Sequence, residues 1–139
     1  MKNHIKDFTP PPQIGIGGFH VGRRSLIINI NVVESDDGFY EWDSIEILPL
    51  QQTYEGITAA LINAKYSNDE MQAITNNMSA KLSLFFEELL TSGLTVAIRT
   101  LKDTYDDSNS TAFKNMQLWR KEAKEIASRA LEFARENGL

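Results

Sequence analysis

The sequence predicts an α+β fold, in which an extended N-terminal arm and a β-hairpin precede three or four helices. Three observations lead to this prediction. Aliphatic residues alternate with mixed residues over residues 25–34, a pattern typical of a strand. Asp37-Gly38 then favours a two-residue hairpin turn, because both residues tolerate positive φ. Beyond Thr53, apolar residues recur at spacings of three and four, which indicates helices.

Residues 1–24 are expected to form the extended arm. The three prolines at 10–12 exclude a helix there, because proline fixes φ and lacks an N–H. The glycine-rich stretch that follows, from Gly15 to Arg24, is loose unless something packs on it. We therefore expect either a flexible arm or a bulged edge strand over this stretch.

Residues 25–50 are expected to form the hairpin. One face of its first strand is purely aliphatic and should meet the core, and it consists of Leu26, Ile28, Ile30 and Val32. The other face is mixed and should meet solvent or a partner, and it consists of Ile27, Asn29, Asn31 and Val33. The two-residue turn would place Ile45 and Ile47 opposite Ile30 and Ile28. It would also place Trp42 beside Val33 on the mixed face, with Tyr40 nearby. A four-residue loop would keep the same faces.

Residues 51–139 are expected to be helical and to complete a single domain with the hairpin. Thr53 is a candidate N-cap, and Ser67 with Glu70 forms a capping box before a second helix that Gly93 should end. Residues 94–105 fit a helix, although residues 94–98 could instead form a short strand. A loop over residues 106–109 should lead into a long helix from about Ser110 to residue 137, with Gly138 as its terminator.

Composition excludes several classes of function. The net charge of −5 argues against a general nucleic-acid binder, which needs a cationic surface. The absence of cysteine removes disulfides, thiolate catalysis and cysteine-ligated metal sites. No apolar run approaches the length of a membrane span, and the N-terminus lacks the apolar core of a signal peptide. We therefore expect a cytoplasmic protein that binds neither membranes nor nucleic acid.

Motifs for chemistry are equally sparse, and we expect no catalytic residue, no metal and no cofactor. His4 and His20 have no metal-ligand spacing, and no nucleophile elbow is present. The run Gly15-x-Gly17-Gly18 resembles part of a phosphate-binding loop, but a strand rather than a helix follows it. A small anion- or nucleotide-binding module that uses the segment from Gly15 to Arg24 is thus the alternative function. A small enzyme with no recognisable motif is a third.

The favoured function is a non-enzymatic interaction or assembly protein that binds protein partners and self-associates. Paired arginines can clamp a partner carboxylate, although they can equally blunt an exposed strand edge. Tryptophan and tyrosine are favoured interface anchors, although they also pack in cores. The candidate interaction residues are Phe19, His20, Arg23, Arg24, Tyr40 and Trp42.

Several segments of the chain resemble small uncharacterised proteins of phages and prophages from Bacteroides-type gut bacteria, associated with tail and tail-fibre regions. The similar segments are residues 8–11, 22–27, 40–42, 64–74 and 116–124. The resemblance is weakest across residues 79–108, which look like an insertion. It implies a role in assembly in the host cytoplasm or in the virion, and it gives no catalytic residue to carry over.

Overall fold

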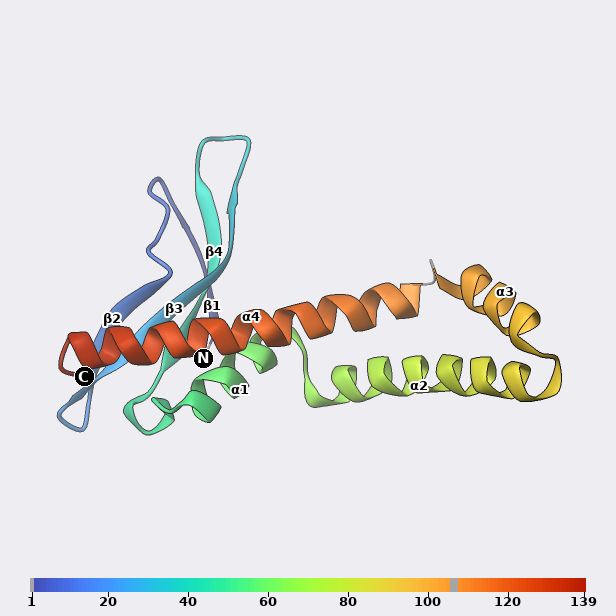
Figure 1. The fold of residues 1–139 in the computed structure, drawn as a ribbon. Coiled ribbons are helices and arrows are strands. Elements are labelled where there is room, and N and C mark those ends of the chain that lie inside the picture. Colours follow the sequence, from blue (N-terminus) through green and yellow to red (C-terminus); the bar gives the residue numbers. More distant parts are fainter. Residues whose placement is uncertain (1, 106–107) are drawn as a thin grey trace. The chain divides into compact units, whose positions relative to one another are not determined.

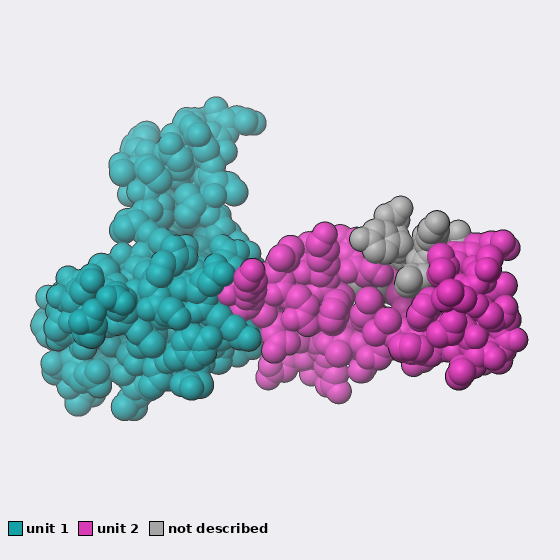
Figure 2. Space-filling view, viewed as in Figure 1, with its two compact units in different colours: residues 1–65, 122–139 teal, residues 66–121 magenta. Residues whose placement is uncertain are grey.

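The computed structural model describes residues 2–105 and 108–139, and the side chains of residues 2–99 and 110–139. It has the predicted α+β composition, with a four-stranded antiparallel sheet and four α-helices among the described residues. The chain divides into two compact units (Figure 2). Unit 1 holds residues 1–65 and 122–139, and unit 2 holds residues 66–121.

The sheet belongs to unit 1 and has the strand order β1-β4-β3-β2 (Figure 1). Its strands are β1 (Lys2–Asp7), β2 (Ile14–His20), β3 (Arg23–Glu34) and β4 (Tyr40–Ile47). The glycine-rich stretch forms a bulged edge strand, which was one of its two expected states, whereas the arm expected before it instead contributes the second edge strand, β1. A lone hairpin leaves its outer backbone groups unpaired, and β1 and β2 satisfy them. The prolines at 10–12 lie in the connection between these strands.

The faces of the hairpin are as predicted near the core, but its register differs by two residues. Ile28 pairs with Ile45, and Leu26 pairs with Ile47. The turn holds three residues rather than two, with Gly38 at φ +83° donating its N–H to the carbonyl of Ser35. A bulge follows Ile30, at residues 31 and 32, which changes the alternation of the strand.

This bulge corrects the expectation for Val32, which is exposed rather than in the core. Asn31 lies at φ +58°, in the left-handed region that asparagine tolerates better than most residues. Its side chain donates a hydrogen bond to Asp43 Oδ2 at 2.9 Å. Asn29, expected toward solvent or a partner, is buried and donates to the carbonyl of Pro12 at 2.8 Å.

Helices cover the aliphatic face of the sheet. Figure 1 shows the C-terminal half of α4 (Ser108–Glu136) crossing the sheet, with α1 (Tyr54–Lys65) beside it. The buried residues of unit 1 that form this core are Leu26, Ile28, Ile30, Ile45, Ile47, Ile57, Leu61, Ala123, Ile126, Ala127, Ala130 and Ala134.

Thr53 caps α1 as predicted, since its Oγ1 accepts the N–H of Gly56 at 3.0 Å. Packing explains the glycine at position 56, because a Cβ there would stand 2.5 Å from the carbonyl oxygen of Gln51. Gln51 ends the short helix η1 (Pro49–Gln51) that follows β4. The intrinsic cost of a glycine in a helix is thus offset by close backbone packing at the start of α1.

Unit 2 consists of α2 (Asn68–Thr91), α3 (Leu94–Tyr105) and the N-terminal half of α4. Ser67 Oγ accepts the N–H of Glu70 at 3.1 Å, which confirms the predicted cap. Gly93 lies at φ +88° between α2 and α3, and residues 94–98 are helical rather than a strand. Of the loop predicted at 106–109, residues 106 and 107 lie outside the described residues, and α4 begins at Ser108.

The end of α4 follows the prediction. Gly138 lies at φ +70°, and the N–H of Leu139 bonds to the carbonyl of Ala134 at 2.8 Å, as in a Schellman motif. Among the described helices, none combines the length and the apolar content that a membrane crossing requires.

Candidate protein-interaction surface

Four of the six candidate interaction residues gather at one end of the sheet, around the turn between β2 and β3. Phe19 pairs with Arg24, and His20 pairs with Arg23, across the two strands. Val21 and Gly22 form the turn between them, with φ of +52° and +79°. Two consecutive residues of positive φ are typical of a type I′ turn. The segment from Gly15 to Arg24 is therefore strand, turn and strand.

Val21 is the unusual residue of this turn. Its β-branched side chain is fully exposed, at 105% of the reference accessibility. A valine with φ of +52° is strained, since branched side chains clash with the backbone in the left-handed region. Asparagine and glycine are the residues that normally occupy such a turn. No packing within unit 1 compensates for the strain, because the side chain of Val21 faces solvent.

Phe19 and Arg24 form an exposed pair beside Val21. The guanidinium of Arg24 lies 4.4 Å from the centroid of the Phe19 ring, in a cation–π contact. The carbonyl of Arg24 accepts a hydrogen bond from Gln52 Nε2 at 2.8 Å, which brings η1 and its exposed Leu50 to this end of the sheet. We call Phe19, Val21, Arg23 and Arg24 the hairpin-end surface; Phe19 and Arg24 lie on one face of the ribbon, and Arg23 lies on the other, with His20. The surface combines two exposed apolar side chains with two cations.

His20 does not share in this surface, because it is held by the sheet itself. Its Nε2 lies 2.7 Å from Glu46 Oε1, and the same oxygen accepts the hydroxyl of Ser25 at 2.8 Å. The pKa of Glu46 is held below its ordinary value, first by the Ser25 hydroxyl and then by His20. Ser25 is completely buried, and Gly17 of β2 lies so close to it that an added Cβ would collide with Ser25 Oγ.

A serine, a histidine and a glutamate are thus brought together, but in an arrangement unlike that of a catalytic triad. In a triad the serine hydroxyl donates to the histidine, and the nucleophile faces the substrate. Here Ser25 donates to Glu46, and it lies beneath the backbone of β2. The three side chains link β2, β3 and β4 through hydrogen bonds. Sequence reasoning missed Ser25 and Glu46, because only the strand register places them beside His20.

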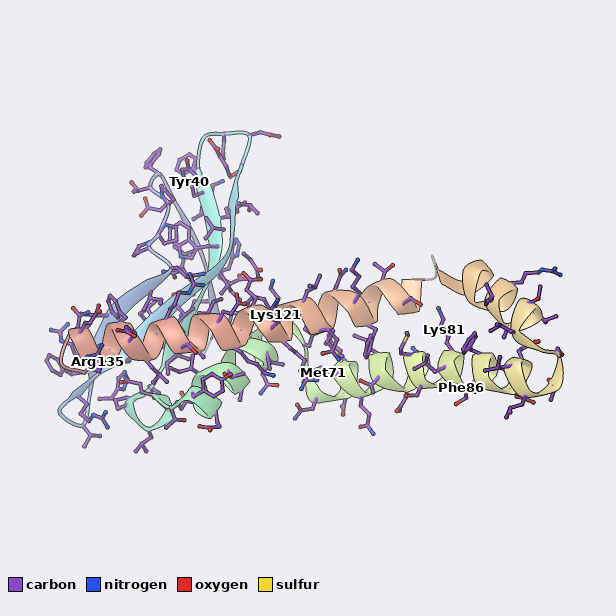
Figure 3. The ribbon with its side chains drawn as sticks, viewed as in Figure 1. Tyr40, Met71, Lys81, Phe86, Lys121 and Arg135 are labelled. Atoms are coloured by element: carbon purple, nitrogen blue, oxygen red, sulfur yellow. The ribbon has the colours of Figure 1, made fainter. Side chains whose placement is uncertain are left out.

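Tyr40 and Trp42 lie toward the opposite end of the sheet, where Figure 3 labels Tyr40. The twelve residues of β3 separate the two ends by about 35 to 40 Å. Trp42 pairs with Ile5 of β1 and is only 6% exposed, so this candidate interaction residue packs within its own chain. Tyr40 is half-buried. The six candidate interaction residues therefore do not lie together, since Tyr40 and Trp42 are remote from the arginines.

A second polar cluster fastens β1 to β4. His4 Nδ1 lies 3.1 Å from Asp43 Oδ1, and His4 Nε2 lies 3.5 Å from Glu41 Oε1. Hydrogen bonds to Asp43 and then to Glu41 raise the pKa of His4 above its ordinary value. The pKa of Asp43 is lowered, first by the amide of Asn31 and, after the opposing effect of desolvation, by His4. The cluster favours a charged imidazolium that bridges two carboxylates.

Two features of the described residues bear on small ligands and metals. A shallow depression of about 230 Å³ lies between β4, η1 and α1, which is below the roughly 300 to 1,000 Å³ of typical ligand sites. Within residues 2–105 and 108–139, no group of three histidine, aspartate or glutamate side chains is placed to hold a metal ion. No family model, curated protein or solved structure matches this chain.

Proposed function

We propose that this chain is a non-enzymatic assembly protein that works by binding other proteins, and that it docks a partner through the hairpin-end surface. Two exposed apolar side chains supply contact area there, and two arginines supply charge-assisted bonds to carboxylates or carbonyls of the partner. The partner surface should therefore be apolar with an acidic rim.

Val21 is the single observation that carries this proposal. A strained backbone costs on the order of 1–3 kcal/mol, and residues of this kind concentrate where a protein binds something. An asparagine at position 21 would satisfy the turn at no such cost. The apolar side chain of Val21 contacts solvent in this chain, so its use must lie in a contact outside it. Phe19, which is also exposed, lies two residues away.

Val21→Asn tests the proposal, because it separates folding from binding. The variant should unfold at a higher temperature than the wild type, since it relieves the turn. It should nevertheless recover less of the partner in affinity capture, as should Arg23→Glu. Val33→Asn is the matched control, because Val33 is an exposed valine near the other end of β3. Undiminished recovery of the same partner with both Val21→Asn and Arg23→Glu would contradict the proposal.

The setting of this assembly role rests on the resemblance to phage and prophage proteins of tail regions. Capture should accordingly be made from cells in which the phage is replicating, with proteins of the virion as the expected partners. The same resemblance supports a place in the host cytoplasm or the virion. Isotope-labelled protein titrated with inorganic phosphate tests the anion-binding alternative, which predicts saturable shifts of the amides of residues 15–24.

A further inference from the structure

The helix α2 is 24 residues long, yet none of its side chains is buried. Its inward-facing residues, among them Met71, Ile74, Met78 and Phe85, are only half-buried. Figure 1 shows α2 beside the N-terminal half of α4, and Lys81 Nζ donates to Ser110 Oγ of α4 at 3.0 Å. A helix of this length normally buries an apolar stripe completely. Much of α2 is therefore left to contact something other than its own unit.

An exposed apolar stripe lies next to the inward face of α2. Leu82, Phe86 and Leu90 follow one another at intervals of four residues, and they are 42%, 56% and 86% exposed. Residues four apart lie on the same side of a helix. Sequence analysis did not single out these residues as a surface.

The same side of α2 is almost without charge. The charged residues of α2 lie elsewhere: Asp69 and Glu70 in its first turn, Glu87 and Glu88 near its end, and Lys81 alone between residues 71 and 86. Lys81 is also turned toward α4, as Figure 3 shows. Solvent-facing helix surfaces are normally rich in charge, and the cores of protein interfaces are depleted of it. The sequence shows where these charges lie, but only the exposed fractions of the side chains show that the uncharged side of α2 faces solvent.

Small residues continue the apolar stripe toward the N-terminus of α2. At 100° per residue, six exposed side chains between residues 75 and 90 share an arc of about 100°. They are Thr75, Ser79, Leu82, Ser83, Phe86 and Leu90. The hydroxyl of Thr75 donates to the carbonyl of Met71 at 2.8 Å, so it can be covered without losing its partner. The face thus has a small-residue half and a large-residue half.

This division makes the face complementary to itself. When two copies pack antiparallel with a two-fold axis between residues 82 and 83, the large residues Phe86 and Leu90 stand level with the small residues Ser79 and Thr75 of the other copy. Leu82 and Ser83 lie on either side of the axis, and each stands beside the same residue of the other copy. A two-fold contact sets a surface against its own copy, so like charges would repel, and this face carries none. Large residues opposite small ones give the interlocking that helix packing requires.

We propose that α2 pairs with α2 of a second copy in this antiparallel register, so that the chain forms a dimer. The inference deepens the proposed assembly role and moves the expected self-association from the hairpin to unit 2. One helix pair covers less than the roughly 1,200 Å² of a stable standard interface. We therefore expect a reversible dimer that forms at micromolar concentration.

Sedimentation of the full chain over a concentration series tests the dimer. The wild type should shift from monomer to dimer, and Phe86→Lys should remain a monomer, since it would bury a lysine in the contact. Leu84→Lys is the matched control, because Leu84 is also 56% exposed on α2 but lies on the opposite side of the helix. It should dimerise like the wild type. The proposal is overturned if the wild type remains monomeric at about 100 times a micromolar protein concentration. Equal dimerisation of the two lysine variants would overturn it as well.

Cross-linking tests the orientation, because the chain contains no cysteine of its own. Ser83→Cys lies beside the two-fold axis and should form a disulfide with its own copy under mild oxidation. Thr75→Cys should not, because fifteen residues of helix, about 22 Å, separate it from the same residue of the partner. A parallel pair would cross-link both variants, and this result would refute the register.

The dimer and the docking proposal can fail separately. Val21→Asn should dimerise as the wild type does, since Val21 belongs to unit 1. Loss of dimerisation in Val21→Asn would place self-association at the hairpin end and overturn the assignment to α2. Loss of partner capture in Val21→Asn with dimerisation intact would support the two proposals as distinct surfaces.

Discussion

Gly17→Ala should destabilise unit 1 by about 2–4 kcal/mol. A Cβ at position 17 would collide with Ser25 Oγ and would stand 3.1 Å from Cδ1 of Ile27. Overpacking of this kind costs about 1–3 kcal/mol. The Ser25 hydroxyl must also leave Glu46, and a hydrogen bond to a charged group contributes about 1.5–3 kcal/mol. The two costs overlap, because moving Ser25 relieves the collision.

Thermal unfolding followed by circular dichroism measures this loss, which should lower the melting temperature by roughly 8–30 °C for a unit of this size. Gly15→Ala is the matched control, because a Cβ at Gly15 on the same strand meets no atom within 4 Å. It should melt near or slightly above the wild type, since alanine restricts the unfolded chain. Ser25→Ala removes the Oγ atom with which the new Cβ would collide. The loss of stability in the double variant Gly17→Ala/Ser25→Ala should therefore be smaller than the sum of the losses in the two single variants. Equal melting temperatures of Gly17→Ala and Gly15→Ala would refute the close packing of β2 on the hydrogen bonds that link β2, β3 and β4.

Three further perturbations address the core, a helix start and an edge strand. Ile30→Asp should cost several kcal/mol of stability in chemical denaturation, because it forces an unpaired carboxylate onto the buried face of β3. A denaturation midpoint equal to that of the wild type would show that Ile30 does not face the core. Gly56→Ala should lose about 1–3 kcal/mol of stability, because its Cβ would collide with the carbonyl of Gln51, even though alanine favours helices. An increase in stability would contradict this packing. The pKa of His4 is raised, so its bridge to Asp43 stabilises β1 fully below the ordinary histidine pKa of about 6.5 and is lost as pH rises through the raised value. Hydrogen exchange of the β1 amides, corrected for intrinsic rates, should therefore show more opening at pH 9 than at pH 6, and His4→Gln should remove the difference.

The sequence by itself determined the α+β class, the helix ends and the aliphatic face of the hairpin. These features depend on local chemistry, which acts within one turn or one strand. Thr53 and Ser67 cap helices because their oxygens reach N–H groups three residues ahead. Gly93 and Gly138 end helices because each takes the positive φ that other residues resist. Alternation along residues 26–30 placed the aliphatic side chains on one face regardless of what covers it.

Only the tertiary structure decided how the strands and faces are paired. Residues 2–7 became the edge strand β1 because β4, some forty residues later in the chain, offered them an unpaired edge. The burial of Trp42 follows from its pairing with Ile5, some 37 positions earlier in the chain. Likewise, the apolar spacing of α2 is the same for a buried stripe and for an exposed one. The exposure of Phe86 distinguishes them, and it depends on how much of α2 the other helices of unit 2 leave uncovered.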